Sequence, residues 1–264
     1  QARILRTKRA CLVGVVVPKI HSESISRVTA GIEQVLSRRG YQMLLASTDN
    51  QPAKEITYLK LFESYPVDGI VLIGTMITGE HKKFLKESKV PVVVVGQYTK
   101  YANCIYHDDY GAGKAMGKIV ADSVRGKGKV AYIGVTREDK AVGAAREDGF
   151  RAGLRAEGVE LEEGYTRKSQ FTMESGYQAA LDLLEKKKDI AIISCATDTI
   201  AAGAIEALHA CSEERIPQSI QNSGTRMKYI LDSSGTQITG FGDNQFLKAV
   251  TGGIPTVHFG YKTS

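Results

Sequence analysis

The amino-acid sequence predicts an α/β protein with two doubly wound lobes, each built around a parallel sheet. Short apolar runs without polar alternation, such as 190–194, are typical of strands buried on both faces of such a sheet. Each run is followed by a segment with apolar residues at helical spacing. This cycle restarts after the glycine- and charge-rich stretch 124–128, and 264 residues exceed the usual size of one domain.

In the first lobe, strands and helices are expected to alternate from residue 11 to residue 125. Ser22 or Ser24 can cap the first helix, and Pro52 begins the second helix at its first turn. The predicted strands are 11–17, 41–46, 67–75, 92–95 and 104–106. The predicted helices are 22–38, one that begins at 52, 80–87, and one that begins at 108 or 109.

The second lobe repeats the alternation, with predicted strands at 129–133, 165–168 and 190–194. Its predicted helices are 144–157, 173–185 and 200–210. From residue 211 the periodicity weakens, and 227–231 fits either a turn of helix or a strand. A further strand is expected from Gln237, and it ends in the polar pair Asp243 and Asn244.

The composition is that of a soluble globular protein, with 42% hydrophobic and 24% charged residues. No apolar run approaches the roughly 20 residues that a membrane span requires, and no segment has the pattern of a secretory signal peptide. We therefore expect no membrane partner. The net charge of +6 is spread over the whole chain and is weak evidence for nucleic-acid binding. The start of the chain is more suggestive, because Arg3, Arg6, Lys8 and Arg9 form a phosphate-contacting or solvated arm.

Motifs for catalysis or metal binding are missing from the sequence. It contains no GxSxG, P-loop or GxGxxG pattern, and His107 beside two aspartates is more typical of a helix start than of a general base. The cysteines lack CxxC spacing and suit buried thiols in a reducing cytoplasm; they are Cys11, Cys104, Cys195 and Cys211. The sequence thus predicts no enzyme, no catalytic residue, no metal site and no cofactor.

Polar residues gather where the predicted strands end. Carboxyl ends of parallel strands are the usual ligand-binding edge of an open α/β sheet, because loops and helix amino termini converge there. The candidates in the first lobe are His21, Ser24, Thr75 and Gln97, and those in the second are Arg146, Phe171, Thr197, Asp198 and Asp243. They suit a polar molecule bound between two lobes. For Thr197 and Asp198, the alternative is that they only cap the following helix.

These stretches, in this order, resemble the effector-binding core of the LacI/GalR family of bacterial transcription repressors. The resemblance covers nearly the whole chain and is carried by 12–18, 67–73, 91–96, 106–112, 131–134, 146–150, 195–204 and 238–243.

The resemblance implies a periplasmic-binding-protein-like fold of type I and a cytoplasmic homodimer that binds operator DNA through a DNA-binding domain absent from this chain. Residues 1–10 are then the end of a hinge or linker to that domain. The implied N-terminal lobe is 11–125, the C-terminal lobe is 126–257, and 258–264 start the crossover back to the N-terminal lobe. A small molecule in the interlobe cleft would control DNA binding.

Within the family, the stretches 106–111 and 195–201 look most like repressors of disaccharide operons of the trehalose or sucrose type. The implied effector is a disaccharide or a sugar phosphate. Arg146 matches an arginine that holds sugar hydroxyls in the family. Phe171 falls where an aromatic residue stacks on the ligand, and Thr197 with Asp198 matches the polar pair of the second lobe. Asp243 lies within one residue of an acidic contact, although about twenty residues (218–237) depart from the family pattern just before it.

The alternative function is a periplasmic sugar-binding protein of a transporter, which shares the two-lobed architecture. The hinge-like start, the lack of a signal peptide and the unpaired cysteines favour the repressor. An enzyme on this fold is a more distant third alternative.

Overall fold

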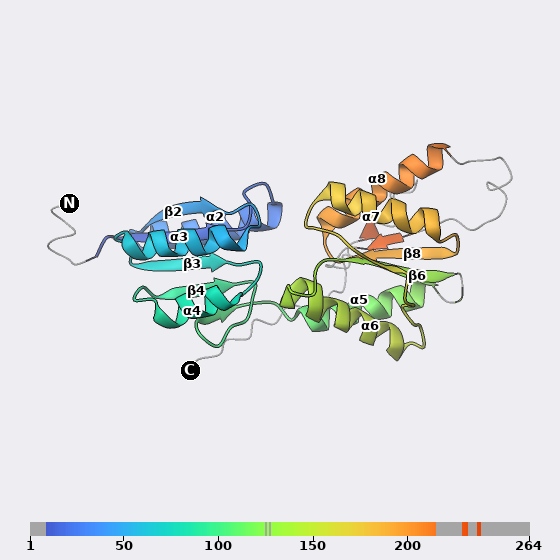
Figure 1. The fold of residues 1–264 in the computed structure, drawn as a ribbon, viewed down its shortest axis with the longest axis horizontal. Coiled ribbons are helices and arrows are strands. Elements are labelled where there is room, and N and C mark those ends of the chain that lie inside the picture. Colours follow the sequence, from blue (N-terminus) through green and yellow to red (C-terminus); the bar gives the residue numbers. More distant parts are fainter. Residues whose placement is uncertain (1–8, 125, 127, 215–228, 232–236, 239–264) are drawn as a thin grey trace. The chain divides into compact units, whose positions relative to one another are not determined.

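The computed structural model describes residues 9–124, 126, 128–214, 229–231 and 237–238. The contacts group the described residues up to His107 into one compact unit and those from Asp108 onward into a second. Each unit is a five-stranded sheet with helices on both faces (Figure 1), as the doubly wound α/β prediction requires.

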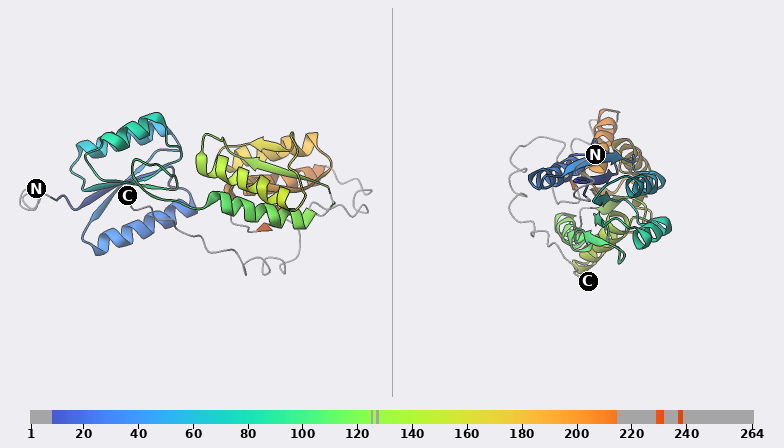
Figure 2. Two further views of the ribbon diagram at one scale, coloured as in Figure 1. Left: turned by 90° about the horizontal axis from the view of Figure 1, so that it is seen from below. Right: turned by 90° about the vertical axis from the view of Figure 1, so that its left-hand side faces the viewer.

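The first sheet has the order β2-β1-β3-β4-β5, and all its neighbouring strands are parallel. Its strands are β1 (Leu12–Val17), β2 (Gln42–Ser47), β3 (Gly69–Ile73), β4 (Val92–Val95) and β5 (Asn103–Ile105). Its helices are α2 (Glu23–Arg38), α3 (Pro52–Ser64) and α4 (Gly79–Glu87). Helix α2 covers one face of the strands, and α3 and α4 cover the other (Figure 2, left).

Strand β1 explains why its apolar run does not alternate with polar residues. Val13, Val15 and Val17 face one hydrophobic cluster, which α2 completes with Ile25 and other residues. Val16 faces the opposite cluster, to which α3 and α4 contribute. Both faces of the strand are therefore buried, so β-branched valines occupy consecutive positions from Val15 to Val17.

The second sheet has the order β10-β9-β8-β6-β7. Its strands are β6 (Lys129–Gly134), β7 (Thr166–Lys168), β8 (Ile190–Cys195), β9 (Tyr229–Leu231) and β10 (Gln237–Ile238). Its helices are α5 (Asp109–Val124), the π-helix η1 (Lys140–Ala145), α6 (Arg146–Ala156), α7 (Met173–Lys186) and α8 (Asp198–Glu214). Helices α5 and α6 lie on one face of the strands, and α7 and α8 lie on the other (Figure 1).

Glycines allow the paired helices of the second unit to approach closely. A Cβ added at Gly117 on α5 would lie 2.2 Å from the backbone oxygen of Phe150 on α6. A Cβ added at Gly203 on α8 would lie 1.9 Å from the backbone oxygen of Met173 on α7. Helix backbones in contact therefore explain glycines that the helical period alone leaves unexplained.

Several details differ from the sequence expectations. The helix expected at 144–157 begins earlier, as the π-helix η1, and continues as α6. Strand β10 runs antiparallel to β9, whereas wholly parallel sheets were expected. Helix α5 packs on α6 and groups with the second unit, so the division falls after His107, whereas the sequence suggested a linker near residue 125.

Two other findings concern exposure and membrane spanning. Cys195 is buried in β8, but Cys11, Cys104 and Cys211 are only partly buried. Within the described parts of the chain, no helix is long and apolar enough to cross a bilayer.

Substituting Gly117 by alanine should destabilise the second unit. The new methyl group collides with backbone rather than with a flexible side chain, so we expect a loss of about 1–3 kcal/mol in the free energy of unfolding. Urea denaturation of both proteins measures it. The matched control is Gly79→Ala in the first turn of α4, where a Cβ meets nothing within 4 Å, and we expect a change of at most about 0.5 kcal/mol. Equal stability of the two variants would contradict the close packing of α5 on α6.

Candidate functional site

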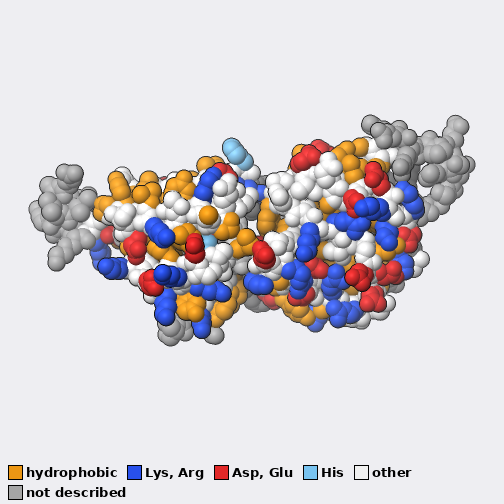
Figure 3. All heavy atoms as spheres, viewed as in Figure 1, with side chains coloured by type: hydrophobic (Ala, Val, Ile, Leu, Met, Phe, Trp, Pro, Cys, Tyr) orange, Lys and Arg blue, Asp and Glu red, His pale blue; other side chains and the backbone are white. Residues whose placement is uncertain are grey.

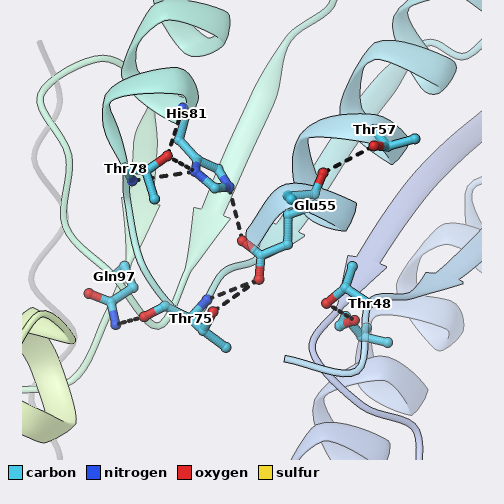
Figure 4. Close-up of polar contacts among 9 residues, drawn as sticks. Thr48, Glu55, Thr57, Thr75, Thr78, His81 and Gln97 are labelled. Carbon is cyan, nitrogen blue, oxygen red and sulfur yellow. Dashed lines mark hydrogen bonds and ion pairs between the residues drawn. The ribbon is translucent and has the colours of Figure 1, made fainter. Parts of the chain in front are cut away.

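At the carboxyl edge of the first sheet, a buried carboxylate holds the loop that follows β3 (Figure 4). Glu55 on α3 has a fully buried side chain, and its Oε1 accepts hydrogen bonds from Thr75 N at 3.3 Å and Thr75 Oγ1 at 3.1 Å. Gln97, at the end of β4, donates from Nε2 to the backbone oxygen of Thr75 at 2.8 Å. Two predicted site residues, Thr75 and Gln97, are thus brought together.

His81 completes this network from the first turn of α4. Its ring is fully buried, and Nε2 lies 2.9 Å from Glu55 Oε2. The backbone N–H of Thr78 points at Nδ1 from 3.3 Å, and the Thr78 hydroxyl lies 2.8 Å from the same nitrogen. Because Nδ1 accepts from Thr78 N–H, the proton belongs on Nε2, which donates to Glu55. The buried carboxylate therefore has three donors, from Thr75 and His81.

His21 and Ser24 lie outside this network. Both are exposed near the start of α2, after the end of β1. The Ser24 hydroxyl lies 3.1 Å from that of Ser22, which occupies the cap position of α2 without a capping side-chain hydrogen bond. The carboxyl edge of the first sheet therefore has a rigid part, around Thr75 and Gln97, and a solvated part, at His21 and Ser24.

At the carboxyl edge of the second sheet, Arg146 is the central cation. Its Nε donates to Asp109 Oδ1 at 3.0 Å, its second terminal nitrogen bonds the same oxygen, and Nη1 donates to Ala196 O at 2.6 Å. The Arg146 side chain is 17% exposed and that of Asp109 only 6%. A guanidinium has five N–H donors. These bonds use three of them, so two remain for other acceptors.

The segment before α6 fixes where Arg146 emerges. Asp139 is buried and caps η1, with its Oδ1 accepting from Ala141 N at 3.0 Å and Val142 N at 2.9 Å. Gly143 packs so closely that a Cβ there would lie 1.9 Å from Thr136 O. The wider π-helical turn delivers Arg146 to the first position of α6, and such turns are frequent at functional sites.

The other predicted residues of the second unit have mixed placements. The Thr197 hydroxyl accepts a hydrogen bond from Ile200 N at 3.4 Å, so Thr197 caps α8, as the alternative prediction held. Thr197 also directly follows Ala196, whose carbonyl oxygen accepts from Arg146. Asp198 is exposed in the first turn of α8. Phe171 is partly buried against the hydrophobic core of this unit. Asp243 lies outside the described residues.

Sequence reasoning missed Glu55, His81 and Asp109. Glu55 is in register with Leu59 and Phe62 on the buried face of α3, and a carboxylate at such a position was an available signal. Asp108 and Asp109 were both assigned to the start of a helix. Only Asp108 acts there, accepting from Gly111 N at 2.8 Å, while Asp109 pairs with Arg146.

His107, the weak candidate for a base, is exposed. Among the residues that the structure describes, no three histidine, cysteine, aspartate or glutamate side chains are grouped to hold a metal ion. The arrangement suits binding of a polar molecule by hydrogen bonds.

Comparison with known proteins gives a consistent result. Residues 10–229 match the family model described as periplasmic binding proteins and sugar binding domain of LacI family. The sucrose operon repressor of Staphylococcus xylosus is 30% identical over 261 residues, which cover 99% of this chain and 74% of that repressor.

Solved structures agree with this result. The transcription regulator CcpA of Lactococcus lactis has a TM-score of 0.71 at 28% identity, with 84% of this chain and 77% of that one covered. The trehalose repressor from Escherichia coli has a TM-score of 0.65 at 22% identity, with 84% and 78% covered, a likeness that concerns the fold alone. The periplasmic-binding-protein-like fold of type I is thus confirmed.

Removing His81 should strongly destabilise the first unit. His81→Ala leaves the buried Glu55 carboxylate without one of its donors and opens a cavity, so we expect a loss of about 3 kcal/mol in the free energy of unfolding, measured by urea denaturation. The matched control is Lys54→Ala, which breaks the exposed ion pair with Asp49 and should cost about 0.5 kcal/mol or less. A His81→Ala protein as stable as the control would show that the network contributes nothing.

Proposed function

The chain belongs to the family of periplasmic binding proteins and LacI-type sugar-binding domains, and on that premise we propose that it is the effector-binding core of a sugar-responsive transcription repressor. The observation that carries the proposal is the Arg146 guanidinium, held at the carboxyl edge of the second sheet with donors to spare. The effector is a disaccharide, and its hydroxyls accept hydrogen bonds from Arg146.

The charge balance at Arg146 favours an uncharged sugar over a sugar phosphate. Asp109 neutralises the guanidinium through two hydrogen bonds to one carboxylate oxygen. A phosphate placed here would meet the aspartate as well as the arginine, whereas sugar hydroxyls need only the remaining donors. We therefore propose an unphosphorylated disaccharide as the ligand.

The other candidates provide complementary contacts in this proposal. Phe171 offers an apolar platform for a sugar ring, and Asp198 accepts from hydroxyls. Thr75 and Gln97 supply the polar set of the first unit, and His21 and Ser24 add to it. Asp243 remains part of the proposal from the family pattern.

The alternative, a periplasmic sugar-binding protein, belongs to the same family by its description. The identity to a sucrose operon repressor along 99% of this chain supports the repressor instead. We propose that the protein is cytoplasmic, binds operator DNA through a separate DNA-binding domain, and is not an enzyme. Sugar binding then changes DNA affinity because the effector prefers one conformation of the core.

We also propose a homodimer, for which the surface of the first unit gives support. Val28 and Val35 on α2 are 39% and 57% exposed, and Leu44 and Leu45 on the edge strand β2 are 38% and 40% exposed. Hydrophobic side chains gather over the part of the first unit where β2 lies (Figure 3). Several large apolar side chains on neighbouring elements are typical of a protein interface.

A thermal-shift screen with trehalose, sucrose, their 6-phosphates and common monosaccharides tests the effector proposal. A ligand that binds only the native state at a hundredfold excess over its dissociation constant adds about 2.7 kcal/mol of stability. We expect the melting temperature to rise with one unphosphorylated disaccharide and not with its 6-phosphate.

Arg146→Lys should abolish that shift while keeping a positive charge next to Asp109, because lysine lacks the forked donors. The matched control is Arg155→Ala in the last turn of the same helix, which is exposed and should keep the full shift. A shift only with phosphorylated sugars, or one that survives Arg146→Lys, would refute the proposed site.

Val35→Glu should weaken the homodimer. A buried carboxylate without a partner at the interface should raise the dimer dissociation constant at least about tenfold, equivalent to about 1.4 kcal/mol. Analytical ultracentrifugation over a concentration series measures the constant. The control is Leu61→Glu on α3, an apolar position of similar exposure, 50% against 57% for Val35, that is not among the four residues of this surface. A monomeric parent protein, or equal effects of the two variants, would contradict the proposed interface.

A further inference from the structure

The core of the second unit contains a small cavity. It lies between the face of the sheet formed by β6 and β8 and the helices α5 and α6, and its volume is about 10 Å³. Most of its lining is apolar, while three polar side chains also border it. The lining residues are Gly113, Met116, Tyr132, Arg146, Phe150, Ser194 and Cys195.

Two residues that line the cavity have hydroxyl groups that make no hydrogen bond to other described protein atoms. Tyr132 Oη and Ser194 Oγ are the buried side-chain oxygens without a hydrogen-bond partner in the part of the chain that the structure describes. Tyr132 is 2% exposed and Ser194 1% exposed. A buried hydroxyl without a partner is unfavourable, so native proteins usually satisfy such groups with protein atoms or with water.

The strand register brings these two residues to the same place. Tyr132 on β6 and Ser194 on β8 are Cα partners in a parallel pair, so their side chains leave the sheet on the same face. The Tyr132 ring stacks on Phe150 with the ring centroids 4.9 Å apart, which fixes the direction of its hydroxyl. The sheet therefore places both residues on the same face, where they line the cavity.

The volume of the cavity limits the size of the molecule that can bind in it. A cavity needs about 10–15 Å³ to hold one water molecule, and an ordered internal water normally makes two to four hydrogen bonds. A sugar ring or even a small organic molecule is excluded by size.

We propose that one structural water molecule binds in this cavity and bridges Tyr132 Oη and Ser194 Oγ. Burial raises the pKa of Tyr132, so its hydroxyl stays protonated and donates to the water. The water donates to Ser194 Oγ, and the side chain of Arg146 also borders the cavity. This inference rests on the core of the second unit and is independent of the proposed function.

A crystal structure of the protein at high resolution tests the site directly. We expect an ordered water within about 2.6–3.2 Å of both hydroxyl oxygens. Relaxation dispersion of ¹⁷O-labelled water should in addition detect one long-lived internal water that is lost in the double variant Tyr132→Phe/Ser194→Ala. An empty cavity, or a direct hydrogen bond between Tyr132 and Ser194, would overturn the proposal.

Thermal melting of single variants gives an independent readout, because the sign of the shift differs between a wet and a dry cavity. If water bridges the hydroxyls, Ser194→Ala and Tyr132→Phe each remove one of its hydrogen bonds and should lower Tm by about 2–4 °C. If the cavity is dry, each variant removes an unsatisfied polar group and leaves Tm unchanged or raised. Tyr65→Phe, at an exposed tyrosine of the first unit, is the matched control and should not change Tm.

Discussion

The parallel register of the strands is the constraint on which both candidate edges depend. Every described pair of neighbouring strands except β9 with β10 is parallel, and helices return the chain over the faces of each sheet. The carboxyl ends therefore gather at one edge in each unit, where backbone groups and short polar side chains are not used by the sheet. Because the strands are buried on both faces, their sequences are continuous apolar runs. The same topology brings polar residues that lie far apart in the chain to one edge of each sheet.

In each unit, a buried carboxylate holds the polar edge in place. Glu55 binds the loop that contains Thr75, and Asp109 binds Arg146, which in turn holds the carbonyl before Thr197. Both carboxylates are buried and are already bonded to neighbouring protein groups. Their role is therefore to position those groups for a ligand and not to contact it themselves. Hydrogen bonds of this kind fix the donors in advance, which lowers the ordering cost when a polar molecule binds. Pairing with Asp109 also removes the net charge of Arg146, and this favours hydroxyl groups as its acceptors.

Local sequence patterns were sufficient to predict where the strands lie and where most helices begin. The four valines at 92–95 form β4 as expected, and Pro52 occupies the first turn of α3. The π-helix η1 could not be predicted, because it depends on capping by Asp139 and on packing of Gly143 against a backbone oxygen. Likewise, the partners of Asp109 and Glu55 lie 37 and 26 residues away, so no local period reveals them. Arg146 and Thr75 were predicted as site residues from the polar corners that follow strands, whereas the groups that hold them could be identified only from the fold.

The central claim is the proposal that an uncharged sugar binds at the carboxyl edge of the second sheet, held by Arg146. Amide hydrogen exchange, measured by mass spectrometry with and without a saturating disaccharide that stabilises the protein, tests this claim most directly. The account predicts slower exchange in the peptides that contain residues 196–200 and the start of α6. Protection confined to other parts of the chain, such as α2 and β2, with none at 196–200, would contradict it.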